Sequence, residues 1–214
     1  MFQNITFKIM FIHNTKKHGA NMPQEINADF LFNEDARVFL IGGFGGVGVP
    51  MKLIEMLAAA NSKNHTIITN DTGTKESGIY PLLKKGKVAK LICSFVGQNR
   101  EAEAYLSKIE LIFLPQGSLA ESIRAGASKI KYFSEKILNK YKITESIDAD
   151  YAFVKASKAD IYGNLFFDGT NRNFNPVMLT AGKETLVEVD EYPVTLKLHE
   201  RMMPGIYVDY LLTR

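Results

Sequence analysis

The chain has 214 residues, of which 46% are hydrophobic and 23% are charged, and its formal net charge is +3. This length and composition suit a globular protein with one sizeable core, and the small charge argues against nucleic acid or a membrane surface as a partner. No apolar run approaches the roughly 20 residues that a membrane-spanning helix needs. Cys93 is the only cysteine, which excludes an intrachain disulfide and suits the reducing cytoplasm.

Residues 1–22 form a poorly patterned N-terminal segment. The segment contains Lys8, Lys16 and Lys17 but no acid, and its interrupted apolar part does not have the form of a secretory signal. We expect a disordered or non-native extension here, with Met22 as an alternative translation start. Residues 23–214 are expected to form a single domain, because no internal repeat or low-complexity linker divides them.

Strand-like and helix-like segments alternate from residue 37 onward. The expected strands are short apolar runs without alternation, typical of strands that are covered on both faces. They span residues 37–41, 65–69, 88–95, 109–114, 150–156, 165–167 and 185–189. The expected helices span residues 50–60, 101–108, 118–125, 129–141 and 176–181. This order predicts an α/β domain of three layers, in which a mainly parallel open sheet has helices on both faces.

A glycine-rich loop, "GGFGGVGVP", joins the first strand of this pattern to the first helix. The spacing Gly43-x-Gly45-x-x-Gly48 is compatible with a dinucleotide-binding turn. Asp71 follows the loop at a spacing in the sequence that suits an acid contacting a ribose. The loop has more glycines than such a turn needs, however, and Pro50 suits the first turn of the helix. A loop of this kind exposes backbone N–H groups above a helix N-terminus, which makes a general site for anions or oxyanions. The spacing alone leaves both interpretations open.

Six further motifs follow the glycine loop in a fixed order. They are "TND-x-G" at 69–73, "SFVGQN" at 94–99, "LPQGSLAESIRAG" at 114–126, "ADYAFVKASKAD-x-x-GNL" at 149–165, "RNFNP-x-M" at 172–178 and "PGIYVD" at 204–209. Together with the loop they resemble the α subunits of family I CoA-transferases, which act on acetate, acetoacetate, butyrate and other 3-oxoacids. The resemblance implies the CoA-transferase fold and makes an NAD(P)-binding Rossmann protein the less favoured alternative.

The resemblance implies a ping-pong transfer of CoA between two carboxylic acids through a glutamyl-CoA thioester. In the family the nucleophilic glutamate lies on a β subunit, in a Glu-x-Gly turn. Glu76 in "KESG" stands in the α pattern instead, and we interpret it as an ordinary loop carboxylate. We therefore expect a partner, the β subunit, in an α2β2 or larger heteromer. Coenzyme A is expected to be a substrate, with no permanently bound cofactor.

The resemblance also assigns site residues to this chain. Asn70 matches an asparagine whose amide lies near the reacting oxygen, although an asparagine after a strand is also a common turn residue. Backbone N–H groups of Gly43, Phe44 and Gly45 are expected to face the substrate carboxylate, the alternative being that the glycines serve only the turn. The expected substrate-binding residues are Gly43, Phe44, Gly45, Gly46, Gln98, Asn99, Gln116 and Gly117.

Several neighbouring motifs are expected to be structural. Ser118 can cap the following helix, with Glu121 three residues on as in a capping box. Arg172 and the asparagines of "RNFNP" are expected to hold backbone, and the lysines of "LLKKGKVAK" to lie in solvated turns. The four histidines have no metal-ligand spacing, so no metal is expected.

The chain departs from the family after Gly126. The next residue is Ala127 where the family has glycine, a threonine- and glycine-rich segment is missing, and the connection is shorter and rich in lysine. The acyl pocket is therefore either more open or rebuilt by Tyr132 and Phe133. A non-catalytic or diverged α-like subunit stays open as an alternative, since one fold can host several functions.

Overall fold

The computed structural model describes residues 22–75, 77–97, 99–137 and 139–213. The extension expected at residues 1–22 therefore lies outside the described residues, apart from Met22. The chain forms strands and α-helices in the order β1 (Gln24–Ile26), β2 (Val38–Ile41), α1 (Met51–Ala59), β3 (His65–Thr69), α2 (Tyr80–Lys84), β4 (Val88–Cys93), α3 (Arg100–Leu106), β5 (Glu110–Phe113), α4 (Gln116–Ala127), β6 (Tyr132–Ile137), β7 (Lys140–Glu145), β8 (Ala149–Ala159), β9 (Leu165–Phe166), α5 (Asn175–Leu179), β10 (Gly182–Glu191) and β11 (Tyr210–Leu212). None of the helices in these described ranges has the length and apolar character needed to cross a membrane.

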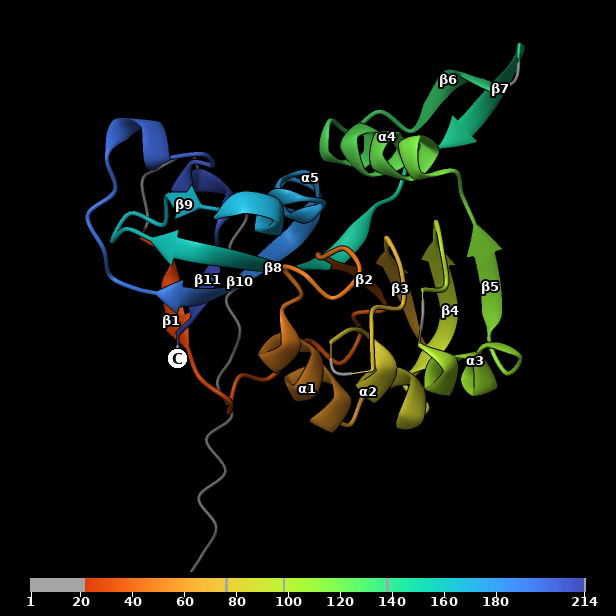
Figure 1. Ribbon diagram of the computed structural model, residues 1–214, viewed down its shortest axis with the longest axis horizontal. Coiled ribbons are helices and arrows are strands. Elements are labelled where there is room, and N and C mark those ends of the chain that lie inside the picture. The colour runs from red at the N-terminus through yellow and green to blue at the C-terminus, as the bar shows by residue number, and fades with distance from the viewer. Residues whose placement is uncertain (1–21, 76, 98, 138, 214) are drawn as a thin grey trace, which may run out of the picture.

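Most strands join one nine-stranded sheet, in which the order is β1-β11-β10-β8-β2-β3-β4-β5 and β9 pairs with β8. All of its pairings are parallel except that of β8 with β9. The sheet is central, with α1, α2 and α3 on one side and α4 and α5 on the other (Figure 1). The three-layer α/β fold predicted from the sequence is confirmed.

The two sides of the sheet carry separate hydrophobic cores because side chains alternate along each strand. On β2, Phe39 and Ile41 enter the core that α1, α2 and α3 cover, and Leu40 enters the core that α4 and α5 cover. Phe153 and Val154 divide in the same way on β8. Both faces of the central strands are therefore apolar, which explains their uninterrupted hydrophobic runs.

The helix predicted for residues 129–141 is wrong. The segment forms the antiparallel hairpin β6–β7, which projects beyond α4 (Figure 1). Its strands are rich in aromatic and β-branched residues, which favour extended backbone. Asn139, in the tight turn, has φ 64°, a left-handed conformation that asparagine adopts more readily than most residues.

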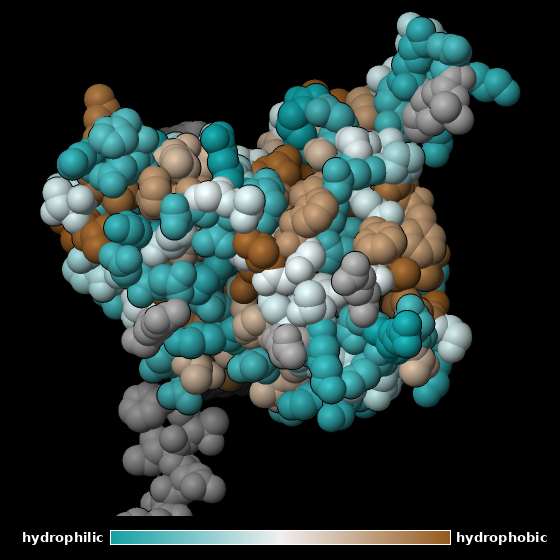
Figure 2. Space-filling model, viewed as in Figure 1, coloured by the Kyte–Doolittle hydropathy of each residue, from teal (hydrophilic) through white to brown (hydrophobic). Residues whose placement is uncertain are grey.

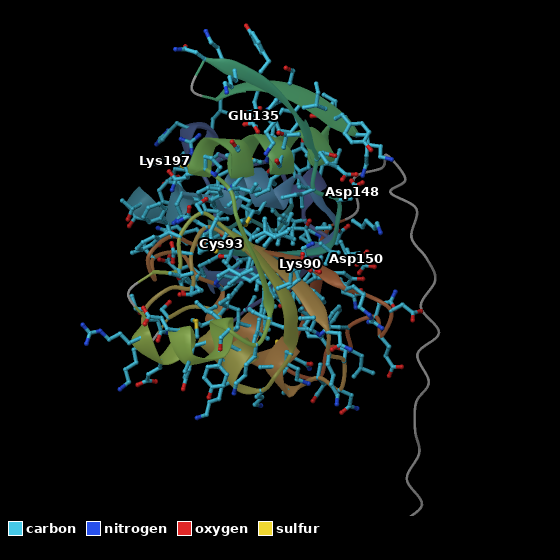
Figure 3. All side chains as sticks on the ribbon, turned by 90° about the vertical axis from the view of Figure 1, so that its right-hand side faces the viewer. Lys90, Cys93, Glu135, Asp148, Asp150 and Lys197 are labelled. Carbon is cyan, nitrogen blue, oxygen red and sulfur yellow. The ribbon has the colours of Figure 1, made fainter. Side chains whose placement is uncertain are left out.

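Two further side chains are buried. Cys93, which lies in the apolar strand segment "KLICSFV", is fully buried at the end of β4, and burial raises its pKa to about 11 (Figure 3). Lys87 does not lie in a solvated turn as the lysine pattern predicts. Its side chain is buried, and Nζ donates hydrogen bonds to the backbone oxygens of Ala60 and Ser62.

Candidate functional site

The candidate site lies where the parallel strands β2, β3 and β4 end. Ile41 of β2 pairs with Thr69 of β3, so the glycine loop after β2 and the "TND" turn after β3 leave the same edge of the sheet side by side. Carboxyl ends of parallel strands are the usual position of ligand sites in open α/β sheets. Asn70 and the glycine loop, which the resemblance assigns to one site, thus lie at the same edge of the sheet.

Between the end of β2 and the start of α1, the glycine loop folds back on itself. Phe44 and Val47 form an isolated antiparallel bridge, in which each N–H donates to the other's carbonyl at 3.0 and 2.9 Å. Gly43, Gly45, Gly46 and Gly48 all have positive φ, between 57° and 114°, which L-residues rarely adopt. The loop therefore needs these glycines for its path, independently of any ligand.

Asp71 is the centre of the hydrogen-bond network beneath the loop. One carboxylate oxygen accepts from the Gly45 N–H at 2.9 Å and from the Asn70 amide at 2.7 Å, and the other accepts from the Gly73 N–H at 2.7 Å. Asp71 is buried, and no reasoning from the sequence gave it this role. Because Asp71 is only 7% exposed and bonds to the loop itself, the structure disfavours the ribose contact of the dinucleotide interpretation.

Both the nitrogen and the oxygen of the Asn70 side-chain amide make hydrogen bonds. Nδ2 donates to Asp71, and Oδ1 accepts from Gln116 Nε2 at 2.9 Å, where α4 begins. Because an amide nitrogen carries two hydrogens, one N–H remains for another acceptor. Asn70 is only 2% exposed in the chain alone. The geometry fixes its direction, and its role as an oxyanion donor stays a prediction.

The N–H groups of the loop divide into two sets. The N–H groups of Phe44 and Gly45, which were expected to face the substrate carboxylate, instead donate to Val47 O and to Asp71 Oδ2. Within the described ranges, the N–H groups of Gly43, Gly46, Gly48 and Val49 donate no hydrogen bond. An incoming oxygen would break no existing bond at these N–H groups; Gly46 is partly exposed, whereas Gly43 and Gly48 are buried in the chain alone.

Apolar side chains surround this polar centre. Phe44 and Val47 on the loop, Phe95 after β4 and Phe113 at the end of β5 are each between 44% and 57% exposed. In Figure 2 apolar surface lies between α4 and the helices α2 and α3, over the strand ends. An exposed apolar rim around oriented donors is typical of a site that another surface completes.

The comparison with known proteins decides the family. A family model described as coenzyme A transferase matches residues 21–134 and 139–213. The chain belongs to the coenzyme A transferase family. The predicted family and transferase class are thereby confirmed.

Curated members of the coenzyme A transferase family align over most of their length. The chain is 36% identical to the acetoacetyl-CoA:acetate/butyrate CoA transferase alpha subunit of Clostridium acetobutylicum, over 85% of this chain and 92% of that relative. It is 37% identical to one subunit of the 3-oxoadipate CoA-transferase of Pseudomonas putida, over 81% of this chain and 85% of that relative. Both relatives are thus named as subunits of a transferase rather than as whole enzymes.

Two solved structures of CoA-transferases share the fold of this chain. An acyl-CoA transferase from E. coli O157:H7, in a thioester complex with CoA, superposes with a TM-score of 0.75 at 22% identity. The match covers 91% of this chain and 50% of that enzyme, so the chain spans half of its length. Glutaconate coenzyme A-transferase from Acidaminococcus fermentans gives a TM-score of 0.68 at 14% identity, covering 83% of this chain and 70% of that one.

The other residues assigned from the CoA-transferase resemblance occupy different positions. Gln116 and Gly117 are exposed in the first turn of α4, next to Asn70. Asn99 is buried, its Oδ1 accepts from Ala102 N at the start of α3 and its Nδ2 donates to Thr74 O, which favours a structural role. Gln98 and Glu76 lie outside the described residues.

The capping box predicted for Ser118 and Glu121 is wrong, because α4 already begins at Gln116. Ser118 instead donates from Oγ to Glu135 on the hairpin at 2.5 Å, and Thr144 donates to the other carboxylate oxygen at 2.5 Å. These two hydroxyls lower the pKa of Glu135. Figure 3 shows Glu135 on the hairpin beside α4, so this contact fastens the hairpin to the helix.

The asparagines of "RNFNP" hold backbone, as predicted. Asn173 Nδ2 donates to Val47 O at 3.0 Å, and Asn175 Nδ2 donates to Gly48 O at 2.9 Å. Both bonds fix the end of the glycine loop that leads into α1.

Among the residues that the structure describes, no three His, Cys, Asp or Glu side chains are grouped as metal ligands.

Proposed function

We propose that this chain is the α subunit of a heteromeric CoA-transferase that moves CoA between a short-chain acyl-CoA and a carboxylic acid. The names of its relatives support this proposal, since they include subunits of acetoacetate, acetate, butyrate and 3-oxoadipate transferases. The proposed acids are acetate, acetoacetate, butyrate or another 3-oxoacid. The proposed partner is a β subunit that carries the nucleophilic glutamate.

One observation carries the proposal: the edge of the sheet holds hydrogen-bond donors but offers no free carboxylate among its described residues. The donors are the second Asn70 amide N–H and the N–H groups of Gly43 and Gly46. The carboxylate in their midst, Asp71, already accepts three hydrogen bonds. A site with donors alone can stabilise an oxyanion, but it needs a nucleophile from a second chain.

In the proposed reaction, this chain supplies the hydrogen-bond donors and the partner supplies the nucleophile. The partner's glutamate attacks the thioester carbonyl, and collapse of the tetrahedral oxyanion breaks the C–S bond to give an acyl-glutamyl anhydride and CoA thiolate. The thiolate then attacks the glutamyl carbonyl, which releases the acid as its carboxylate and leaves a glutamyl-CoA thioester. The accepting carboxylate enters by the reverse steps. In each step Asn70 and the free loop N–H groups would meet the developing oxyanion.

The test uses the chain purified together with a candidate β subunit that carries a Glu-x-Gly turn. We expect exchange of CoA between acetyl-CoA and acetoacetate or butyrate, and a loss of kcat of about 10²- to 10³-fold for Asn70→Ala. Asn27→Ala, at an exposed position after β1, which lies at the opposite edge of the sheet from β5, is the control and should not change the rate.

Three results would contradict parts of the proposal. Unchanged exchange with Asn70→Ala would remove Asn70 from the mechanism. Exchange by the isolated chain would overturn the need for a partner's glutamate. A stable complex that exchanges CoA with no short acid would favour the non-catalytic alternative.

A further inference from the structure

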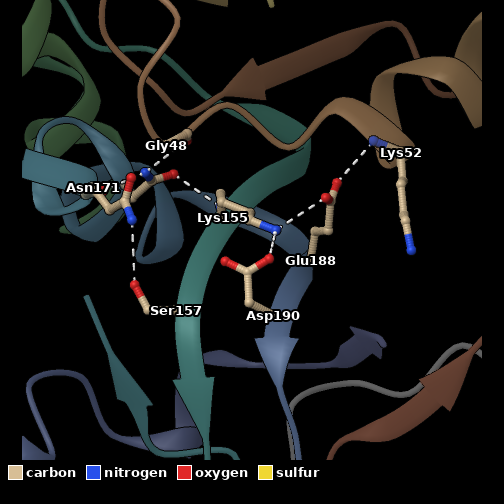
Figure 4. Close-up of polar contacts among 8 residues, drawn as sticks. Gly48, Lys52, Lys155, Ser157, Asn171, Glu188 and Asp190 are labelled. Carbon is tan, nitrogen blue, oxygen red and sulfur yellow. Dashed lines mark hydrogen bonds and ion pairs between the residues drawn. The ribbon is translucent and has the colours of Figure 1, made fainter. Parts of the chain in front are cut away.

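The glycine loop is anchored to the half of the sheet on the opposite side of β2 from Asn70. Asn175 is fully buried, its Nδ2 donates to Gly48 O at 2.9 Å, and its Oδ1 accepts from the Lys155 N–H on β8 at 3.0 Å. On β10, Glu188 Oε2 accepts from the N–H of Lys52, in the first turn of α1, at 2.8 Å. The end of the loop and the beginning of α1 therefore depend on two separate buried side chains (Figure 4).

Lys155 joins these two anchors. Its backbone bonds to Asn175, and its Nζ lies 3.1 Å from Glu188 Oε1 and 2.7 Å from Asp190 Oδ1. The side chains of Lys155 and Glu188 are only 14% and 8% exposed. Figure 4 shows the chain of contacts running from Gly48 through Lys155 to Glu188 and Lys52.

Stability alone does not account for this buried ion pair. Desolvation of two buried charges offsets most of their attraction, and apolar pairs of similar volume are often as stable. The position of Glu188 is informative instead. The residue before α1 is Pro50, which makes no side-chain cap, and Glu188 places a negative charge at the positive end of that helix.

We infer that Glu188, held by Lys155, is a positioning residue that fixes the glycine loop and the start of α1 so that the free loop N–H groups meet the reacting oxygen. This inference rests on the proposed function for its catalytic consequence. Glu188 touches no reacting atom and acts through Lys52 N and the loop. Its loss should therefore weaken binding of the transition state more than binding of the acyl-CoA.

The same two strands supply a matched control. Lys158 and Glu191 are paired in register three residues further along β8 and β10, at 3.6 Å, with side chains 35% and 58% exposed. That pair has the same chemistry but lies further along the strands, without a hydrogen bond to the described residues of the loop. Glu188→Gln is thus compared with Glu191→Gln in the full chain.

The first measurement is hydrogen–deuterium exchange of the backbone amides of residues 42–52, made on the chain without a partner. Replacing a charged acceptor by a neutral amide should accelerate this exchange about fivefold in Glu188→Gln, with no change in Glu191→Gln. Unchanged loop exchange in Glu188→Gln, or equal acceleration in the control, would overturn the inference. This result does not depend on any transferase activity.

The second measurement is CoA exchange with the β subunit. Glu188→Gln should lower kcat about fivefold with the KM for acyl-CoA unchanged, and a rise in KM alone would overturn the positioning role. If Glu188→Gln fails to fold, the double variant Lys155→Met/Glu188→Leu removes both charges together, with Lys158→Met/Glu191→Leu as its control. An inactive parent complex would reject the proposed function, while the loop exchange would still decide the role of Glu188.

Discussion

Replacing Gly42 with alanine should destabilise the chain by about 3 kcal/mol through a single side chain. An added Cβ would overlap Asn175 Oδ1 and lie 2.9 Å from Asn175 Cγ, so the buried amide must move. Three hydrogen bonds of that amide, with Lys155 N, Gly48 O and Asn171 O, are 2.8 to 3.0 Å long, and a fourth, to Asn173 Oδ1, is 3.4 Å. At about 1 kcal/mol for each bond lost, the cost is about 3 kcal/mol. Gly42 is not among the glycines with positive φ, so backbone strain does not contribute.

Urea denaturation of the variants measures this cost. Gly117→Ala is the control: its new Cβ meets nothing within 4 Å, and alanine suits a helix, so its unfolding free energy should stay the same or rise by less than about 1 kcal/mol. The variant Gly42→Ala/Asn175→Ala should be no less stable than Asn175→Ala, because the overlapping atom is absent. A Gly42→Ala chain within about 0.5 kcal/mol of the parent would refute the reasoning.

Three other predictions concern separate parts of the chain. Ser118→Ala should raise the pKa of Glu135, which a carboxyl NMR titration would measure. Because the pKa of Glu135 is lowered in the folded state, its contact with Ser118 stabilises the hairpin fully above the ordinary glutamate pKa. That stabilisation is lost as the pH falls through the lowered value. An unchanged titration in the variant would contradict the contact. Cys93 should not react with an aromatic disulfide at about pH 8 until urea unfolds the chain, since burial raises its pKa to about 11; rapid labelling of the native chain would contradict this. Tyr141→Ser should change the unfolding free energy by less than about 0.5 kcal/mol, because Tyr141 is 78% exposed, and a larger loss in urea would contradict that exposure.

The sequence predicts the central sheet well because burial on both faces leaves a strong local signal. β2, β3, β4, β8 and β10 all lie within or across predicted strands, and the loop and turn that follow β2 and β3 meet as expected. This follows from one rule, that carboxyl ends of neighbouring parallel strands lie at the same edge. Asn70 could therefore be placed beside the glycine loop without coordinates.

The hairpin could not be predicted in the same way. Its segment is rich in lysine and has apolar residues at spacings that also fit a helix, and its two strands pair with each other outside the main sheet. The turn at Asn139 and the contact of Glu135 with Ser118 decide the structure, and both depend on the folded backbone.

Glu188 and Asp71 were missed for a different reason. A charged residue inside the apolar strand "TLVEVDE" is a signal that the side chain has a buried partner, and that signal was present. The sequence could not identify the group that bonds to Glu188, because Lys52 N lies 136 residues earlier in the chain. Asp71 accepts from the Gly45 N–H only because the loop glycines adopt positive φ, and the spacing of the glycines in the sequence does not define that path.

The distant anchoring of the glycine loop has a consequence for synthesis on the ribosome. The bonds that fix the end of the loop and the start of α1 join positions 127 and 136 residues apart, with the later partners on α5 and β10. A nascent chain that has emerged as far as β5 already contains every strand on the Asn70 side of the loop, yet neither of these two anchors. Assembly of this cleft is thus a late event, and premature termination before β10 would yield polypeptide without an ordered site.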